Sequence, residues 1–350
     1  MNEKNLKIAL IQPPLPGHKF RGTGSYTQEL YKALKKSDQV EITLANVDDR
    51  LDSFNIIHYP YFDPFFLTLP LIKRKPIIVT VHDLIPLKFP RFMPAGIRGR
   101  LKWQIQRFSL SQAASIITDS IASKDDIKKY TQNTDSKINV IYLGIGEEFK
   151  IIRSSEALDK VRKKYILPQE FILHVGDVNY NKNISNLIKA FNLVCKKFAS
   201  LHLLLIGNGF VNPSNQLSEL LSIINSLRLT DKIHRISHIT TDDLVLIYNL
   251  ASIYAQVSFA EGFGLPVLEA MTCGIPVIAS NISSLPEVVG EAGILVDPYN
   301  IYSISDGMLT ILQDKSKRDR IIQKGMERIK LFNWKKCAAE TIKVYESVIS

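Results

Sequence analysis

The sequence is poor in cysteine and lacks the residue clusters that usually bind metals. Its three cysteines, Cys195, Cys273 and Cys337, lie far apart in the chain, so neither a disulfide framework nor a thiolate metal site is expected. No Asp-x-Asp pair occurs, and the seven histidines are scattered. A protein metal site is therefore not expected.

Long hydrophobic runs are also missing. The most apolar stretch, residues 59–72, is interrupted by Asp63 and three prolines, well short of the ~20 continuous apolar residues of a membrane-spanning helix. The segment MNEKNLKIALIQ passes from a charged start straight into a strand-like run, without the apolar core and small-residue cleavage site of a signal peptide. With so few cysteines, these features predict a protein of the reducing cytoplasm.

The composition is that of a soluble globular protein. Hydrophobic residues make up 45% of the 350 residues and charged residues 22%, and this length favours two domains. Short strand-like runs alternate with helix-length periodic segments, which is typical of α/β proteins whose parallel sheets are covered on both faces. We therefore predict two such sheets.

The strand-like runs fall into two groups. Those of the front half are expected at Leu6–Ile11, Ile56–Tyr59, Ile77–Val81, Ile116–Thr118 and Ile138–Ile141. Those of the back half are expected at Phe171–Val175, Leu203–Ile206, Ile253–Ala255, Val277–Ala279 and Ile294–Val296. The polar stretch 150–169 is the expected linker.

The segment 259–280, FAEGFGLPVLEAMTCGIPVIAS, is the most informative one. Two carboxylates, Glu261 and Glu269, flank a glycine-bearing turn, with Pro266 at the expected helix start and Gly274 just past its end. The N–H groups and dipole of that helix start favour a diphosphate, and a carboxylate can accept hydrogen bonds from sugar hydroxyls. Alternatively, both are ordinary acids near a helix start.

The whole string resembles the signature of the family 4 glycosyltransferases, also called group 1. It preserves Glu-Gly-Phe-Gly-Leu-Pro, the second Glu, and the Gly-Ile-Pro-Val turn, followed by Leu285-Pro286-Glu287 and Gly293–Val296. The resemblance implies an α/β protein of GT-B architecture, with two facing Rossmann-like domains and a cleft between them. It also implies roles for Glu261 in catalysis and for Phe263, Gly264, Leu265 and Glu269 in donor binding.

The resemblance implies an acceptor-binding domain at residues 1–165, completed by a final helix at 334–350. The donor-binding domain is expected at 166–333. Within the first domain, Gly22, Thr23 and Gly24 stand between the first strand and a helix expected at 25–36, where glycine lets the backbone approach a phosphate. The same pattern can be simple turn chemistry, but the resemblance places it at the donor diphosphate.

His82 follows an apolar strand, at the sheet edge where open α/β sheets bind ligands. It also resembles the histidine of a His-Asp-Leu segment that faces the donor sugar in this family, which implies a catalytic role. A structural role is the alternative. His58 is a weaker candidate of the same kind.

Lys182 precedes a helix expected at 184–198 and could neutralise phosphate, although it could also be an exposed lysine. The family usually adds an arginine where this chain has Asp177 or Asn181. Losing a guanidinium removes a bidentate phosphate clamp, so donor affinity or activity is in question. The remaining donor-binding candidates implied by the resemblance are Gly207, Asn208, Gly209, His238 and Ile239.

The net charge of +10 is concentrated in the front half. Residues 1–150 carry 22 basic and 15 acidic residues, against 22 and 19 in residues 151–350. A segment that interleaves cations with aromatics could meet an anionic membrane or a lipid-linked diphosphate, or could be a solvated helix face. It contains Arg91, Arg98, Arg100, Lys102 and Arg107 with Phe89, Phe92, Trp103 and Phe108. Nucleic acid is not an expected partner, because no nucleic-acid-binding motif accompanies the charge.

The resemblance implies metal-independent, retaining transfer of a sugar from a nucleoside diphosphate sugar to a saccharide or lipid-linked acceptor of a cell-surface polysaccharide, without a cofactor. The segments 82–90 and 117–124 look most like mannosyltransferase members, so GDP-mannose is the first donor expected and a UDP-sugar the alternative. A sugar-nucleotide epimerase and a catalytically silent partner of another transferase are further alternatives. The protein is expected in the cytoplasm, and at the inner face of the membrane if the basic segment meets lipid.

Overall fold

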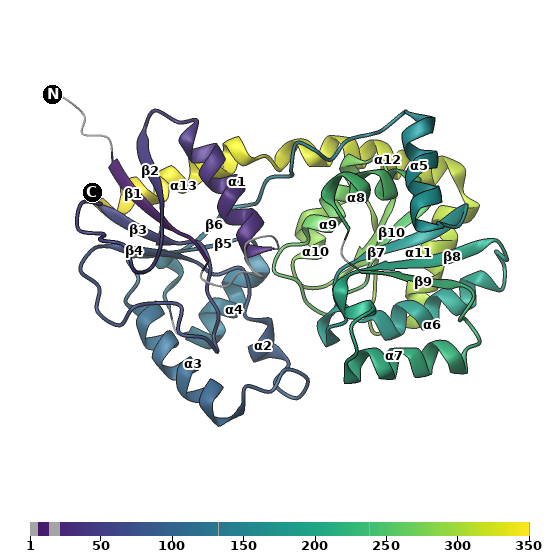
Figure 1. Ribbon diagram of the computed structural model, residues 1–350, viewed down its shortest axis with the longest axis horizontal. Helices are drawn as coiled ribbons and strands as arrows, with labels where there is room; N and C mark the ends of the chain where they lie inside the picture. Colours follow the sequence, from purple (N-terminus) through teal and green to yellow (C-terminus); the bar gives the residue numbers. More distant parts are fainter. Residues whose placement is uncertain (1–5, 14–21, 132, 238, 350) are drawn as a thin grey trace. The chain divides into compact units, whose positions relative to one another are not determined.

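The chain folds into two compact units (Figure 1). The computed structural model describes residues 6–13, 22–131, 133–237 and 239–349. The first unit comprises residues 1–144 and 332–350, and the second comprises residues 145–331. Each unit is built on one six-stranded parallel sheet, so the predicted α/β fold with two sheets is confirmed.

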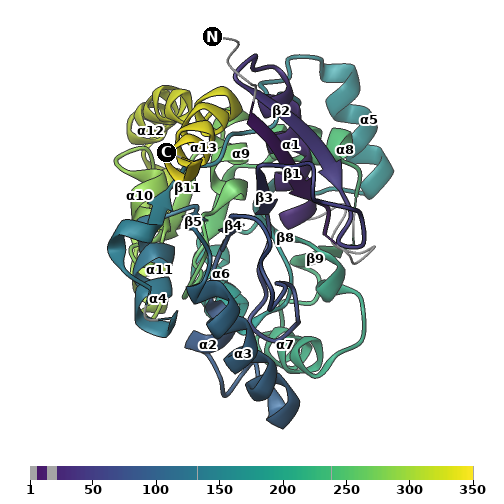
Figure 2. The ribbon, with the colours of Figure 1, turned by 90° about the vertical axis from the view of Figure 1, so that its left-hand side faces the viewer.

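The sheet of the first unit has the strand order β2-β1-β3-β4-β5-β6 (Figure 2). The strands are β1 (Leu6–Ile11), β2 (Val40–Ala45), β3 (Ile56–Tyr59), β4 (Ile77–Thr80), β5 (Ser115–Thr118) and β6 (Ile138–Val140). The helices are α1 (Thr23–Lys35), α2 (Ile85–Lys88), α3 (Gly96–Ser111), α4 (Ile121–Thr131) and α13 (Trp334–Ile349), with a 3-10 turn at Asp135–Lys137. Every residue of β3, β4 and β5 is buried, as expected for strands covered on both faces.

The sheet of the second unit has the order β12-β11-β10-β7-β8-β9. Its strands are β7 (Glu170–Val175), β8 (Leu201–Ile206), β9 (Ile233–Ile236), β10 (Ile253–Gln256), β11 (Val277–Ser280) and β12 (Ile294–Val296). Its helices are α5 (Ser155–Tyr165), α6 (Ile184–Cys195), α7 (Asn215–Ser226), α8 (Thr241–Leu250), α9 (Leu265–Thr272), α10 (Leu285–Val289), α11 (Ile301–Gln313) and α12 (Lys315–Arg328). Short 3-10 turns lie at Tyr180–Lys182, Asn208–Phe210 and Ile329–Leu331.

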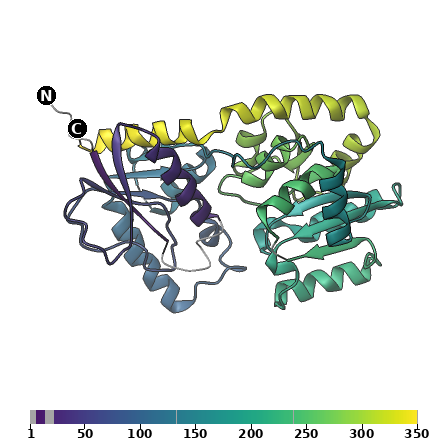
Figure 3. The ribbon, with the colours of Figure 1, turned by 45° about the horizontal axis from the view of Figure 1, so that its top comes forward.

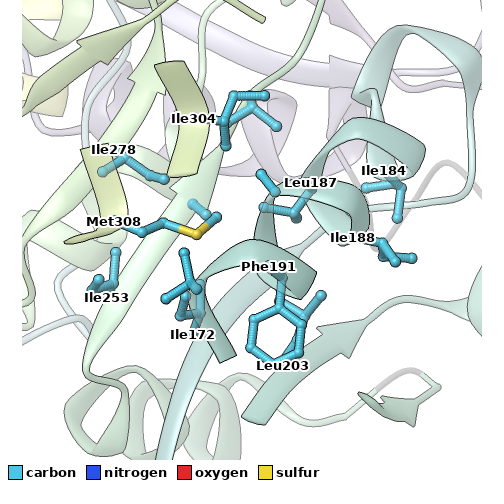
Figure 4. Packing of buried hydrophobic residues seen from close by; sticks show 14 of the residues in the cluster. Ile172, Ile184, Leu187, Ile188, Phe191, Leu203, Ile253, Ile278, Ile304 and Met308 are labelled. Atoms are coloured by element: carbon cyan, nitrogen blue, oxygen red, sulfur yellow. The ribbon is translucent and has the colours of Figure 1, made fainter. Parts of the chain in front are cut away.

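The core of the second unit lies between its sheet and two helices, α6 and α11 (Figure 4). Leu187 and Phe191 point from α6 toward Ile172 and Leu203 of the sheet, and Met308 extends from α11 into the same cluster. All five side chains are fully buried. This packing fixes the position of the start of α6. Lys182 lies just before this helix.

The segment 150–169 is not a linker. It contains α5, whose helix start is capped by Ser154, and Lys164 and Tyr165 at its end donate hydrogen bonds to the Asp243 carboxylate of α8. These contacts place residues 145–165 in the second unit, so the observed boundary follows Gly144 rather than residue 165.

The C-terminal helix α13 belongs to the first unit, where it packs against α1 (Figure 3). Its buried Tyr345 hydroxyl is 2.7 Å from His58 Nδ1, and His58 Nε2 is 2.8 Å from Thr80 Oγ1. Burial lowers the pKa of His58 to about 3, so the ring is neutral. His58 therefore joins α13 to the sheet, and it has no exposed surface.

Candidate functional site

The candidate site of the second unit centres on the turn that follows β10. Gly264 has φ of +113°, and a Cβ there would lie 2.8 Å from Leu285 Cδ2, so this position requires glycine. Helix α9 begins directly after it, with Pro266 in its first turn, and ends before Gly274 at φ of +75°. No side chain caps the start of α9. Pro266 has no N–H and the Val267 N–H donates to the Gly264 carbonyl at 3.0 Å, so the Leu265 N–H is the group of this helix start that can meet an anion.

Glu261 is held by two side chains. Lys182 Nζ donates to Oε1 at 2.9 Å and to Oε2 at 2.8 Å, and Ser258 Oγ donates to Oε1 at 2.6 Å. The Glu261 side chain is 8% exposed and that of Lys182 19% exposed. A carboxylate so enclosed needs a cation or hydrogen-bond donors, and here it has both. The structure therefore brings together two residues that the sequence named separately.

The two departures from the family pattern have structural partners here. Asn181 Nδ2 donates to the Ala260 carbonyl at 3.0 Å, and Phe259 N–H donates to the Asn181 carbonyl at 2.7 Å. Asp177 accepts a hydrogen bond from the Gly209 N–H at 2.9 Å. Asn181 thus fastens the Lys182 turn to the Glu261 loop, and Asp177 fastens the loop after β7 to the loop after β8.

Glu269 stands on α9, where the Tyr248 hydroxyl donates to its Oε2 at 2.8 Å. Burial raises the pKa of Glu269 to about 7, and the hydrogen bond from Tyr248 offsets only part of this. This carboxyl group can therefore change its charge near neutral pH. Phe263 beside it is buried, whereas Leu265 is half-buried.

The glycines after β8 pack against the loop after β7. A Cβ on Gly207 would lie 1.7 Å from the Gly176 carbonyl oxygen, and one on Gly209 would lie 2.8 Å from the Val178 nitrogen. Asn208 begins the 3-10 turn between them. Ile239 is buried, and His238 lies outside the described residues.

No role was predicted for His174 from the sequence. It is the penultimate residue of β7, and its Nδ1 is 2.9 Å from the Ala255 carbonyl, which fixes Nδ1 as the donor. Burial lowers the pKa of His174 to about 4, and its Nε2 has no partner in the described part of the chain. The ring is thus neutral, with an acceptor nitrogen left over. Its position near the carboxyl end of a buried strand is the signal that could have singled it out.

The candidate residues of the first unit form a separate group. Gly22, at φ of +40°, precedes α1, and Thr23 and Gly24 form the first turn of that helix without a side-chain cap. The Thr23 hydroxyl is buried and has no partner among the residues that the structure describes. The helix start therefore offers polar groups to a ligand.

His82 has a hydrogen-bond acceptor at each ring nitrogen. Nδ1 is 2.5 Å from Asp119 Oδ2, and Nε2 is 3.2 Å from the Pro60 carbonyl. Burial lowers the pKa of His82, but the Asp119 carboxylate outweighs it and the net shift is upward. Because both acceptors require an N–H, the ring is best satisfied as an imidazolium. His82 is therefore suited to act as a fixed cation rather than as a base.

No described group of three or more His, Cys, Asp or Glu side chains is placed to hold a metal ion. In the same part of the chain, no helix has the length and apolar character needed to cross a bilayer.

Two family models together match most of the chain. The model for glycosyl transferases group 1 matches residues 156–328, and the model for glycosyltransferase family 4 matches residues 10–149. O-antigen chain mannosyltransferase B of Escherichia coli is 31% identical over 288 residues, which cover 82% of this chain and 74% of that protein.

The serotype-specific mannosyltransferase WbdA of Escherichia coli is 28% identical over 298 residues, and these cover 84% of this chain but only 36% of that longer protein. Among solved structures, sucrose-phosphate synthase from Thermosynechococcus elongatus matches with a TM-score of 0.79 at 19% identity over 99% of both chains. The fold is therefore one that solved proteins share along nearly its whole length.

Proposed function

The chain belongs to the group 1 glycosyltransferases of family 4, and we propose that it is a retaining, metal-independent mannosyltransferase. It moves mannose from GDP-mannose to a saccharide or lipid-linked acceptor in the synthesis of a cell-surface polysaccharide. The similarity to mannosyltransferases that act on O-antigen chains supports this choice of donor and pathway. The enzyme works in the cytoplasm and requires no cofactor, because the nucleotide sugar is itself the substrate.

The Lys182–Glu261 pair is the observation that carries the proposal. A diphosphate at the start of α9 would draw the Lys182 ammonium toward its own charge, while sugar hydroxyls would replace that ammonium as donors to Glu261. The buried carboxylate then keeps its hydrogen bonds as the ion pair opens. Bound donor thus exchanges one set of partners of Lys182 and Glu261 for another.

The transfer needs no protein nucleophile. The bond from the anomeric carbon to the β-phosphate oxygen breaks, and its electron pair leaves with the diphosphate, which Lys182 and the Leu265 N–H at the start of α9 stabilise. The acceptor oxygen bonds to the same face of the anomeric carbon, and its proton passes to the departing phosphate oxygen. Gly22, Thr23, Gly24 and the His82 cation of the first unit are further proposed participants in the transfer, as hydrogen-bond donors and a positive charge.

The remaining donor contacts follow from the second unit. Glu269 accepts hydrogen bonds from ribose hydroxyls, and the loop Gly207–Gly209 with Phe263, Leu265, His238 and Ile239 forms the nucleotide pocket. Asp177 and Asn181 also have structural roles, since each makes a hydrogen bond between loops.

The test is the release of nucleoside diphosphate from GDP-mannose, UDP-glucose, UDP-galactose and UDP-N-acetylglucosamine with EDTA present and mannose oligosaccharides as acceptors. Preference for GDP-mannose with transfer to the acceptor supports the proposal. Preference for a UDP-sugar would make the enzyme a UDP-sugar-dependent member of the family. Release of free nucleotide with an epimerised sugar, or neither turnover nor nucleotide binding, would overturn it in favour of an epimerase or a silent partner.

A further inference from the structure

Helix α3 of the first unit has its apolar face turned outward. Ile97, Leu101, Ile105 and Phe108 follow one another at helical spacing, and they are 80%, 63%, 38% and 57% exposed. A helix that packs on a globular core normally shows the opposite arrangement. Exposed apolar side chains scattered singly are ordinary, but a stripe of them marks an interaction surface.

The inner face of α3 buries Gly99, Gln106, Ser109 and Leu110, and its two polar side chains are bonded to the loop that the helix covers. The Gln106 side-chain oxygen accepts hydrogen bonds from Thr68 N–H at 3.0 Å, from the Thr68 hydroxyl at 2.8 Å and from Leu69 N–H at 3.0 Å. The Ser109 hydroxyl donates to the Pro70 carbonyl at 2.6 Å. Gln106 and Ser109 are both fully buried, so rotating α3 to bury its apolar stripe would leave these polar groups without partners. The outward orientation of the stripe is therefore built into the fold.

The same loop adds more apolar surface. Its exposed side chains are Phe66, Leu67, Leu71 and Ile72, with exposed fractions between 53% and 81%. Lys102 of α3 lies with its Nζ 5.2 Å from the centre of the Phe66 ring, which joins the loop to the helix. We call these four residues and the four of the α3 stripe the α3 surface. Figures 1 and 2 both draw α3 on the outside of the first unit.

The charge around the α3 surface has one sign. Residues 64–118 contain nine Lys and Arg and a single acidic residue, Asp83. Arg91, Arg98, Arg100 and Arg74 are exposed, and Lys73 lies against α3, where its Nζ donates to the Ser109 carbonyl. An apolar stripe bordered by cations matches the interface of an anionic bilayer, where acyl chains lie beneath negative head groups.

We propose that the α3 surface docks the protein on an anionic lipid bilayer, with the apolar stripe entering the head-group region and the flanking cations pairing with lipid phosphates. A second copy of the chain fits less well, because an isologous contact would bring two sets of these cations together. Single-stranded nucleic acid fits less well too, because stacking needs aromatic platforms and six of the eight residues are aliphatic. The proposal rests on this surface and not on the proposed transfer reaction.

The experiment is sedimentation of the purified protein with vesicles of phosphatidylcholine, with and without phosphatidylglycerol. We expect binding to the anionic vesicles at least about tenfold stronger than to the neutral ones, and weaker as salt is raised, because several basic residues lie near the lipid phosphates and salt screens their attraction. Equal binding to both kinds of vesicle, or none to the anionic ones, would overturn the proposal.

Two pairs of variants test the surface itself. Ile97→Ser with Leu101→Ser, and Arg98→Glu with Arg100→Glu, should each weaken binding to anionic vesicles at least about tenfold. The matched controls are Ile166→Ser, which removes a side chain that is 84% exposed in the second unit, and Lys196→Glu with Lys197→Glu. Neither control should change vesicle binding. All variants should release nucleotide from a soluble donor as the wild type does, so loss of docking is distinguishable from loss of catalysis.

Sedimentation velocity without lipid separates the rival occupants. We expect one species whose sedimentation coefficient does not depend on protein concentration and is the same in the Ile97→Ser, Leu101→Ser double variant. A dimer that this double variant converts to monomer would assign the α3 surface to self-association instead and would overturn the bilayer assignment.

Discussion

Lys182 donates hydrogen bonds to both carboxylate oxygens of Glu261, across 79 residues of sequence. The pair joins the turn before α6 to the turn before α9, and each side chain is largely enclosed. A charge pair so placed is poised to exchange partners when an anion and a set of hydroxyl groups arrive together. The proposed donor offers both in one molecule.

Removing either member of this pair should abolish most of the transfer. We expect Lys182→Ala and Glu261→Ala each to lower kcat/KM by at least about 100-fold, because removal of one charge-stabilising group commonly costs that much. The matched control is Lys189→Ala, which removes an exposed lysine from α6. Circular dichroism and thermal unfolding would show that each variant is folded, and wild-type rates in folded Lys182 and Glu261 variants would refute the assignment.

Donor affinity should depend on the ionisation of Glu269. Its pKa is raised to about 7, and the ionised carboxylate accepts hydrogen bonds from hydroxyl groups more strongly than the neutral acid does. The affinity for GDP-mannose should therefore fall as the pH is lowered through about 7, in a calorimetric titration. A nucleotide sugar is the suitable probe, because its diphosphate is esterified at both ends and its own charge therefore does not change near neutral pH. Glu269→Gln should bind more weakly with a flat pH profile, and an unchanged profile in this variant would disprove the role.

Glu269 should also make the stability of the protein depend on pH. The pKa of Glu269 is about 7 in the folded protein against 4.5 for its ordinary value, so the folded state binds the extra proton in that window. Stability should consequently decrease as the pH rises from 4.5 to about 7, and Glu269→Gln should lose this component. Urea unfolding of both proteins across this range measures it, and parallel curves would contradict the shift.

Asp119 should keep His82 protonated. His82 is flanked by the Asp119 and Asp83 carboxylates, the Pro60 carbonyl, the edge of the Tyr26 ring and the neutral His58. Asp119→Asn removes the charge that most favours the protonated His82 ring and keeps the shape of the side chain. The pKa of His82 should therefore be lower in this variant than in the wild type. Activity that needs the cation should then decline as the pH rises through neutrality.

Titration of the His82 ring by nuclear magnetic resonance measures this pKa directly. The signal of the ring is identified by its loss in His82→Gln. The stability due to the His82–Asp119 pair is present at low pH and is lost as the pH rises through the folded-state pKa of His82, because that pKa is raised. An identical His82 titration in Asp119→Asn and in the wild type would contradict this arrangement.

Gly207 should tolerate no side chain. A methyl group there would meet the Gly176 carbonyl at 1.7 Å, so Gly207→Ala should displace one of the two loops and cost about 1–3 kcal/mol of unfolding free energy. Gly325→Ala is the control, because its Cβ would meet Met271 side-chain atoms only at 3.4 Å and longer. That variant should be neutral or up to about 1 kcal/mol more stable, since alanine favours a helix interior. Equal stability of the two variants in urea unfolding would contradict the close approach.

The sequence predicted best the elements that are buried on both faces. β3 has the predicted bounds, and β4 and β5 differ from them by one residue at one end, because an unbroken apolar run is visible without knowledge of its neighbours. The edge strands β2 and β9 were not predicted. Their buried residues are only Val40 and Ala45 in β2 and Ile233 in β9, so neither strand shows a continuous apolar run. Helix α5 was missed for a related reason, since Val161 is its only buried residue and gives no apolar stripe.

The pairings within the site could not be predicted. Sequence motifs pointed to Lys182, Glu261 and His82 as separate residues, but a partner 79 or 37 positions away depends on how the loops pack. Asn181 and Asp177 show the same limit, because their departure from the family pattern did not reveal that each makes a hydrogen bond between two loops. The outward orientation of the apolar stripe of α3 could not be predicted either, because it depends on the burial of Gln106 and Ser109.

The linkage that the enzyme forms is the most direct test of its central activity. GDP-mannose carries mannose in the α configuration, so transfer in EDTA to a mannose oligosaccharide should give a new α-linked mannose, read from the anomeric signals by nuclear magnetic resonance. A new α-mannosyl residue in the wild type, and none with Lys182→Ala, is the result that we predict. A β-linked product, or a product formed only when a divalent metal is supplied, would contradict retaining, metal-independent transfer at this site.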